Sequence, residues 1–221
     1  MTSMIHKLEW TDVNLDKFIE ILEVQDEFKE KGLDEEVSIQ YTSKMITLLF
    51  DVENPESLPL HEWSLAVEYI KFLGTPVPET KHKKEFVLNG REYSFHDNPF
   101  KISAGQFFDW RQCIHQENGS IDYKECLSVF LIPKGHKYND GYDFDLVKED
   151  IGTICIVDAL SLFSFFVSVL QTSLKVFKDY LLYQLKEVEK GSTLQHEEMD
   201  KLKMTMELIE TMNPDRLHQT E

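Results

Sequence analysis

Apolar residues recur every three to four positions through the first third of the chain, and this spacing predicts three short helices. Asn14 can cap the first helix and Gly32 closes it, Asn54-Pro55 ends the second, and Gly74 ends the third. The short loops between them predict that the three helices pack as neighbours. Their apolar faces consist of Leu15, Phe18, Ile19 and Leu22, then Val37, Tyr41, Met45, Leu48 and Leu49, then Trp63, Ala66, Tyr69, Ile70 and Leu73.

A β-hairpin is predicted near residues 85–96, where two apolar runs flank Asn89-Gly90. An Asn-Gly pair in this position favours a two-residue turn of type I′, because both residues tolerate a positive φ. Two strands alone are marginally stable in water. We therefore expect this hairpin either to pack on a helical layer or to pair with another chain.

Two further helices are predicted in the middle of the chain. Ser103 and Gln106, three residues apart, can cap each other's backbone donors at a helix start, and the helix then runs to about His115. A second helix is expected from Ser120 to Phe130. Beyond it, residues 133–142 are rich in Pro, Gly, Asn and Asp and are typical of a surface loop.

The last part of the chain predicts one long helix that begins at an Asp145 cap and runs to about Lys190. Up to Leu170 it is apolar nearly all round, which is typical of a helix buried in a core. A membrane span is the alternative for Ile154 to Leu170, but this stretch is about a turn short of the roughly 20 residues that a bilayer needs. Its few polar residues also fall in one narrow stripe.

From Leu174 on, the pattern becomes amphipathic, and Gly191-Ser192 divides it into two apolar seams at helical spacing. The two seams indicate either an antiparallel helical hairpin or a surface that binds other chains. We take these seams as the candidate partner-binding site. Its residues are Leu174, Phe177, Leu181, Leu185, Val188, Met199, Leu202, Met206 and Ile209.

Together these elements predict a mainly α protein: a helical domain with one small β-hairpin and a long C-terminal helix or helical hairpin. The predicted division is a helical body over residues 1–170 and an amphipathic C-terminal extension over residues 171–221. A chain of 221 residues, 42% of them hydrophobic, is long enough to bury a core of its own.

Charge narrows the set of partners. The net charge is −17, with 40 acidic against 23 basic residues, and this argues against a nucleic-acid partner. The one basic cluster, Lys81-His82-Lys83-Lys84, is better interpreted as a solvated strand edge than as an anion site. The first ten residues lack the apolar core of a signal peptide, so the protein is expected to be intracellular when made.

The three cysteines, Cys113, Cys126 and Cys155, are odd in number and widely spaced. This pattern indicates neither a disulfide framework nor a zinc ribbon, and it fits a reducing cytosol. Cys113 and His115 cannot form a catalytic dyad on one helix, because residues two apart point to nearly opposite sides. We therefore interpret Cys113 as a core residue.

No catalytic, cofactor-binding or metal-binding residue is predicted. The oxygen ligands at Asn139, Asp140, Asp143, Asp145 and Glu149 lack the order of a calcium loop and are interpreted as a turn followed by a helix cap. No phosphate-binding loop is present in the sequence. An enzyme is kept as an alternative, with a scattered site at Asp109, His115, Asp140 and Asp143.

Five short sequence phrases stand out along the chain. They are Glu9-Trp10-Thr11-Asp12, Leu88-Asn89-Gly90-Arg91-Glu92-Tyr93, Ile102-Ser103-Ala104-Gly105-Gln106-Phe107-Phe108-Asp109, Phe130-Leu131-Ile132-Pro133-Lys134-Gly135 and Tyr138-Asn139-Asp140-Gly141-Tyr142. In the order of these phrases the chain resembles a family of proteins from tailed phages of Bacteroidetes hosts, including crAss-like phages, and more distantly the T4-type baseplate assembly proteins. The resemblance covers roughly Leu8 to Phe166.

This resemblance implies a non-enzymatic protein of virion assembly, a tail or baseplate assembly factor that acts through protein–protein contacts. The alternative that it implies is a permanent subunit of the neck, the head–tail connector or a tail ring. Its partners would be other phage tail or neck structural proteins, with a homo-oligomer possible inside an assembly and neither nucleic acid nor membrane involved. The expected location is the host cytoplasm during assembly, and the virion if the protein is a permanent subunit.

Overall fold

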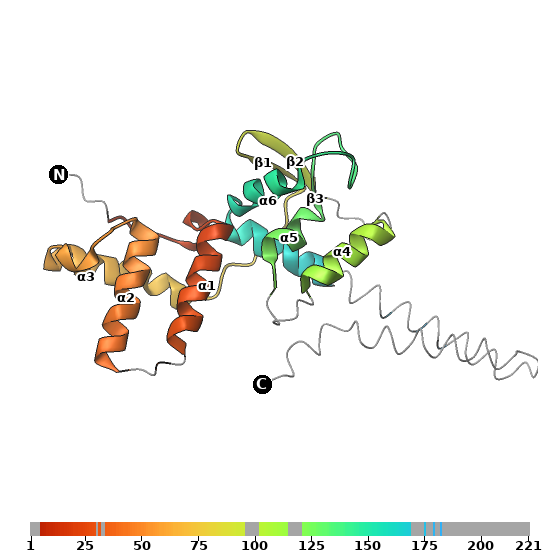
Figure 1. Ribbon diagram of the computed structural model, residues 1–221. Coiled ribbons are helices and arrows are strands. Elements are labelled where there is room, and N and C mark those ends of the chain that lie inside the picture. The colour runs from red at the N-terminus through yellow and green to blue at the C-terminus, as the bar shows by residue number, and fades with distance from the viewer. Residues whose placement is uncertain are drawn as a thin grey trace, which may run out of the picture. The chain divides into compact units, whose positions relative to one another are not determined.

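The computed structural model describes residues 5–29, 31, 34–95, 102–114, 121–168, 175, 179 and 182. These residues form a mainly helical protein with a small antiparallel sheet (Figure 1). Contacts divide the chain into two units, Met1–His96 with Ser103–Leu162, and Asp97–Ile102 with Phe163–Glu221. The elements described below belong to the first unit unless stated otherwise. The predicted boundary at residue 170 stays a prediction.

The three predicted N-terminal helices are confirmed. They are α1 (Leu15–Lys29), α2 (Glu35–Phe50) and α3 (Leu60–Tyr69), and a 3-10 turn (Ile70–Gly74) extends the last of them to the predicted end. Asn14 caps α1, since its Oδ1 accepts a hydrogen bond of 2.8 Å from the N–H of Lys17. The predicted end of α1 at Gly32 lies outside the described residues.

The predicted end of α2 is wrong. The helix stops at Asp51, which adopts a left-handed conformation with φ 53°, three residues before Asn54-Pro55. Pro55 instead opens a separate 3-10 turn, Pro55–Ser57. This position suits proline, because its fixed φ is compatible with the first residue of a helical turn and its missing N–H has no partner to lose there.

Trp10 lies just before α1 and packs against the helices that follow it. Its ring lies edge-on to Phe18 and Phe72, at centroid distances of 6.0 and 5.0 Å. Its indole N–H donates to the carbonyl oxygen of Thr75 at 3.1 Å. A buried tryptophan thus has its apolar ring packed and its one polar atom satisfied.

The hairpin is confirmed, and it belongs to a larger sheet than predicted. Strands β1 (Glu85–Leu88) and β2 (Arg91–Phe95) flank Asn89 at φ 47° and Gly90 at φ 77°, as a type I′ turn requires. A third strand, β3 (Leu131–Pro133), pairs antiparallel with β2 and gives the order β1-β2-β3. The added strand supplies part of the support that a two-stranded hairpin lacks.

Strand β3 corrects the prediction of a helix from Ser120 to Phe130. The helix, α5 (Tyr123–Ser128), is shorter and is capped by Asp122, which accepts from the N–H of Glu125 at 2.8 Å. Residues Val129 to Ile132 are all at most 2% exposed. An apolar run of this length does not distinguish a helix end from a buried strand, and the pairing with β2 decides for the strand.

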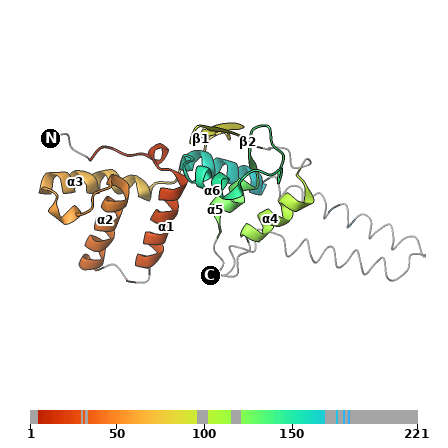
Figure 2. The same ribbon diagram turned by 45° about the horizontal axis from the view of Figure 1, so that its top comes forward.

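Side chains of the hairpin alternate between the two faces of the sheet. Phe86, Leu88, Tyr93 and Phe95 are buried, whereas Val87 is 70% exposed. The sheet lies against α6 (Phe144–Gly152), as the two views agree (Figures 1 and 2). The expected packing of the hairpin on a helix is therefore found within this chain.

The capping pair at the start of α4 (Ala104–Ile114) is confirmed. The N–H of Ser103 donates to Oε1 of Gln106 and the N–H of Gln106 donates to Oγ of Ser103, both at 3.1 Å. Gln106 is buried and also donates through Nε2 to the carbonyl oxygen of Val129 at 3.0 Å. One side chain thus closes the helix start and ties α4 to the residues before β3.

The prediction of a single long helix from Asp145 is wrong. Helix α6 begins after Asp143, not Asp145, with Asp143 Oδ1 accepting from the N–H of Leu146 at 3.1 Å, and it ends at Gly152. Residues 153–155 leave the helix, and a new helix follows over the described residues 156–168, the last of which belong to the second unit. The predicted buried character is confirmed for Ile154, Ile156 and Leu162, which are at most 1% exposed.

A β-bridge explains this interruption. Asn14 pairs with Cys155, the N–H of Leu15 donates to the carbonyl oxygen of Ile154, and the N–H of Ile156 donates to that of Val13, both at 2.8 Å. Gly152 permits the approach, since a Cβ there would lie 2.1 Å from Oδ2 of Asp16. Backbone groups that would continue α6 are therefore used to join the two ends of the first unit. Of the helices in the described part of the chain, none is both long and apolar enough to cross a bilayer.

Candidate functional site

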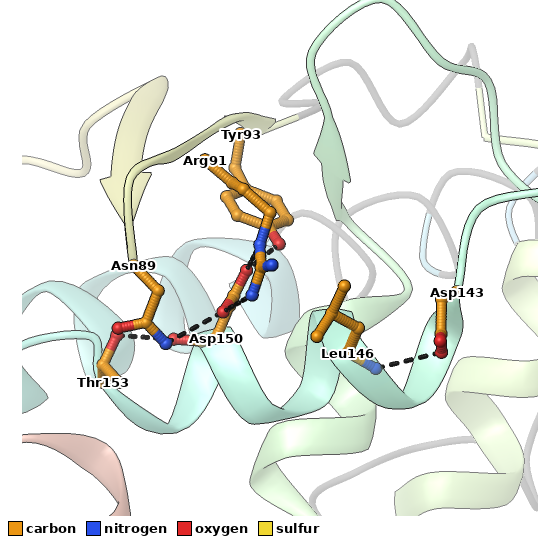
Figure 3. Close-up of polar contacts among 7 residues, drawn as sticks. All are labelled: Asn89, Arg91, Tyr93, Asp143, Leu146, Asp150 and Thr153. Atoms are coloured by element: carbon orange, nitrogen blue, oxygen red, sulfur yellow. Dashed lines mark hydrogen bonds and ion pairs between the residues drawn. The ribbon is translucent and has the colours of Figure 1, made fainter.

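The most highly organised polar group among the described residues surrounds Asp150, a fully buried carboxylate on α6. Both Nε and Nη2 of Arg91 donate to it, the hydroxyl of Tyr93 donates to Oδ2, and Nδ2 of Asn89 donates to Oδ1 at 2.9 Å (Figure 3). We call these four residues the Asp150 cluster. Each carboxylate oxygen accepts two hydrogen bonds, so the positions around it are filled.

Local structure places every member of the Asp150 cluster. Asn89 occupies the first position of the type I′ turn, and Arg91 and Tyr93 lie two residues apart on β2, so their side chains leave the same face of the strand. Asp150 lies between the buried residues Val147 and Ile151, on the face of α6 that turns toward the sheet. Figure 3 shows Arg91 and Tyr93 reaching from β2 down to α6.

The contacts in the Asp150 cluster fix the protonation state of its three ionisable members at neutral pH. Hydrogen bonds from Arg91, and to a lesser extent from Tyr93 and Asn89, together lower the pKa of Asp150 to about 2 against the opposing effect of burial. Burial, followed by the hydrogen bond to Asp150, raises the pKa of Tyr93 to about 12. Hydrogen bonding to Asp150 also raises the pKa of Arg91.

Chemically, this arrangement is a clamp. The carboxylate stays ionised, the phenol stays neutral, and the guanidinium side chain, 44% exposed, remains cationic. A general base needs a free lone pair directed at a substrate proton, and Asp150 has none to offer. The cluster holds the hairpin on α6.

Acid should weaken this clamp in a defined range. The pKa of Asp150 is about 2 in the folded protein and has an ordinary value of 3.8, so its stabilising effect is complete above about pH 5 and is lost as the pH falls through about 2. We expect the difference in free energy of unfolding between the wild type and Asp150→Asn to be constant above about pH 5 and to narrow below it. Urea denaturation followed by circular dichroism at several pH values measures this.

A control for the acid experiment comes from Glu27. Hydrogen bonds from Lys31 and Lys44 also lower its pKa to about 2, so the wild type alone would not identify which group titrates. Glu27→Gln is introduced into both the wild type and Asp150→Asn. The difference in free energy of unfolding between these two proteins should then keep the same pH dependence. A gap of constant size down to pH 2 would contradict the assignment to Asp150.

A small polar pocket lies beside α4 and α5. Its volume is about 190 Å³, and the hydroxyl of Tyr138 donates to Asp109 at its wall. Burial and this bond raise the pKa of Tyr138. Glu125, also in the wall, forms an ion pair of 3.2 Å with Lys148. The lining residues are Asp109, Gln112, Glu125, Val129, Tyr138, Asn139 and Phe144.

The scattered enzyme site is only partly brought together. Asp109 lines this pocket, whereas among the described residues Asp140 and Asp143 are not part of its lining, and Asp143 is engaged as the cap of α6. His115 lies outside the described residues. Within the part of the chain that the structure describes, no three His, Cys, Asp or Glu side chains are grouped so that they could hold a metal ion.

An apolar groove of about 390 Å³ lies between α1 and α2. Phe28 and Tyr41 meet there edge-on at 5.7 Å, and the ammonium group of Lys31 lies 4.2 Å from the centroid of the Phe28 ring. Its walls carry both signs of charge, Asp26 and Lys29. The groove is a recess in the helical surface, with nothing in its lining that selects one kind of ligand.

The predicted partner-binding seams cannot be placed. All nine seam residues, from Leu174 to Ile209, lie outside the described residues. The seams therefore stay a prediction from the sequence.

Sequence reasoning missed the Asp150 cluster. A signal was present: Asp150 interrupts an apolar stretch on the same helix face as Val147 and Ile151, and a buried acid requires a donor elsewhere. Its partners lie 57 to 61 residues away in the sequence, so only the fold identifies them.

Comparison of the chain with family models, curated proteins and solved structures finds no match.

Proposed function

We propose that this protein is a non-enzymatic virion-assembly protein of a tailed phage, a tail or baseplate assembly factor that acts through protein–protein contacts. The observation that carries the proposal is the position of the phrases that resemble the phage family. One phrase forms the β1–β2 turn and its side chains hold Asp150, and another forms the cap of α4. A third forms β3 and the turn after it.

These phrases use their polar groups to build the framework. Asn89, Arg91 and Tyr93 all donate to one carboxylate, and Ser103 and Gln106 satisfy each other's backbone. A protein that works by presenting a shaped surface needs such rigid internal contacts. Its contact residues would then be sought on the outside, where Phe108, within one of the phrases, is 61% exposed.

The alternative role is that of a permanent subunit of the neck, the head–tail connector or a tail ring. The two roles differ in whether the protein remains in the finished particle. Mass spectrometry of purified virions from the phage that encodes this chain separates them. An assembly factor gives no peptides, whereas a ring subunit gives peptides at a fixed ratio to the other tail or neck proteins.

A salt series on the purified chain gives an independent test. The net charge of −17 opposes self-association at low ionic strength, and salt screens that repulsion. An assembly factor should remain a small species from about 0.05 to 1 M salt, as measured by light scattering. A ring subunit should grow to a defined larger size as the salt concentration rises. Growth together with peptides in virions would overturn the assembly-factor role.

A further inference from the structure

The turn of the hairpin exposes its backbone and holds one side chain inward. Asn89 and Gly90, the two central residues of the type I′ turn, are both exposed. Nδ2 of Asn89 nevertheless donates to Oδ1 of the fully buried Asp150 at 2.9 Å (Figure 3). A Cβ added at Gly90 would meet no atom of the described residues within 4 Å, its chain neighbours apart. Water therefore reaches the peptide bond between the two residues, while the Asn89 amide is bound.

An Asn-Gly pair is a site of spontaneous chemistry. The backbone nitrogen of the glycine can attack Cγ of the asparagine, because glycine has no side chain that obstructs the approach. The bond between this nitrogen and Cγ forms, the bond between Cγ and Nδ2 breaks, and ammonia leaves with the proton of the attacking N–H. A water molecule then opens the cyclic imide. Cleavage at Cγ gives aspartate, and cleavage at the backbone carbonyl carbon gives isoaspartate.

The folded turn opposes this attack in two ways. Asn89 has φ 47°, and a type I′ turn places its ψ at about +30°. At this ψ the nitrogen of Gly90 lies nearly opposite the Cβ of Asn89 about the Cα–C bond, so it cannot reach Cγ. The hydrogen bond to Asp150 also holds the Asn89 amide on the side of α6. The reaction therefore requires that the turn open and that the amide leave Asp150.

We propose that Asn89 is a deamidation site gated by the Asp150 cluster, and that its conversion irreversibly releases the hairpin from α6. The reaction takes place in molecules whose hairpin has opened. Because opening is a local equilibrium, the rate of deamidation follows the population of the open form. The Asp150 cluster keeps that population low by holding Asn89, Arg91 and Tyr93 on one carboxylate.

Neither product fits the folded turn. An aspartate at position 89 replaces the donor to Asp150 by a second carboxylate, and like charges at hydrogen-bonding distance repel each other. An isoaspartate adds a methylene group to the backbone of a two-residue turn, which shifts the pairing of Leu88 with Arg91. This inference does not depend on the proposed function, because it follows from the turn and its contact with Asp150.

The first test compares the folded full chain with the same chain unfolded in urea. Peptide mapping by mass spectrometry follows Asn89 and also Asn118, which begins the other Asn-Gly pair of the sequence and lies outside the described residues. Both should deamidate in urea, whereas in the folded wild type the rate at Asn89 should be at least about tenfold lower. Equal rates at Asn89 in the two states would overturn the proposal, as would an Asn89 that stays intact in urea while Asn118 reacts.

A second test removes the acceptor. In folded Asp150→Ala, deamidation at Asn89 should be at least about tenfold faster than in the folded wild type, whereas Glu149→Ala should stay within about twofold. Circular dichroism checks that each variant is folded. Tyr93→Phe, which removes only the hydroxyl that donates to Asp150, should also accelerate the reaction and replaces Asp150→Ala if that variant does not fold. An unchanged rate in the folded variant would overturn the role of the Asp150 cluster.

A third test makes the product directly. Asn89→Asp should lower the unfolding temperature by at least about 5 °C, because it places two carboxylates together. Asn139→Asp is the matched control, since Asn139 is exposed and also has a positive φ, 60°. This control should shift the unfolding temperature by no more than about 2 °C. Equal shifts would assign the loss to added charge or to the backbone conformation and would overturn the release of the hairpin.

Discussion

Replacement of Asp150 by alanine is expected to lower the free energy of unfolding by about 3 kcal/mol, the lower end of the cost of breaking a buried ion pair. The hydroxyl of Tyr93, a residue only 1% exposed, and the amide of Asn89 would both lose their acceptor. The guanidinium of Arg91 is 44% exposed and can turn to water, which keeps the loss from being larger. Urea denaturation followed by circular dichroism measures the change.

Glu149 provides the matched control for this substitution. It is the residue directly before Asp150 on α6, carries the same charge and is exposed. Glu149→Ala should change the free energy of unfolding by no more than about 0.5 kcal/mol. Similar losses for the two alanine variants would contradict the clamp, because they would point to helix propensity or net charge as the cause.

Arg91→Met tests the same cluster by removing the cationic partner of Asp150. It leaves the Asp150 carboxylate at 0% exposure with only the neutral donors Tyr93 and Asn89. Removing Arg91 leaves the buried charge of Asp150 uncompensated, so a clear loss of stability is expected here too. The double variant with Asp150→Leu should recover part of the stability, because it removes the uncompensated charge.

Features set by neighbouring residues could be predicted from the sequence. The type I′ turn needs only Asn89-Gly90 between two extended runs, and the capping pair needs only Ser103 and Gln106 three residues apart. In both cases the residues that interact are within one turn of each other. Their chemistry therefore determines the local conformation before any tertiary contact forms.

Features set by distant contacts could not be predicted. The apolar run at β3 becomes a strand because β2 lies beside it, and residues 153–155 leave the helix because they pair with the chain around Asn14. Helix α6 by itself carries no proline that would require a break. Tertiary hydrogen bonds decided both cases against the local helical pattern.

The same distinction applies to the candidate site. Alternation along β2 predicts that Arg91 and Tyr93 share a face, but it does not predict what faces them. The group that faces them is the carboxylate of Asp150, on a helix about sixty residues later in the sequence. Conversely, the scattered set of Asp109, His115, Asp140 and Asp143 was assembled from residue type alone, and the described part of the fold gives Asp143 a capping role.

Partner binding is expected to depend on the seams after Leu174. Truncation after Lys190 removes Met199, Leu202, Met206 and Ile209, and we expect it to leave a folded body with weaker binding to other tail or neck proteins. Circular dichroism and co-purification with those proteins measure the two effects. A truncated chain that fails to fold would instead make the second seam part of the structure, and the partner surface would lie elsewhere.

A pair of methionines sharpens this prediction. On the predicted helix, at about 100° per residue, Met206 and Met204 would be about 200° apart, so the sequence predicts Met206 on the seam and Met204 on the opposite face. Met206→Asp places a charge where an apolar side chain would be buried against the partner, and the dissociation constant should rise at least about tenfold. Met204→Asp makes the same chemical change and should leave the affinity within about twofold. Titration of each full-length variant against the co-purifying partner measures both values. If both substitutions weaken binding equally, the added charge and not the seam controls the affinity. If neither substitution changes the dissociation constant, the second seam is not part of the interface.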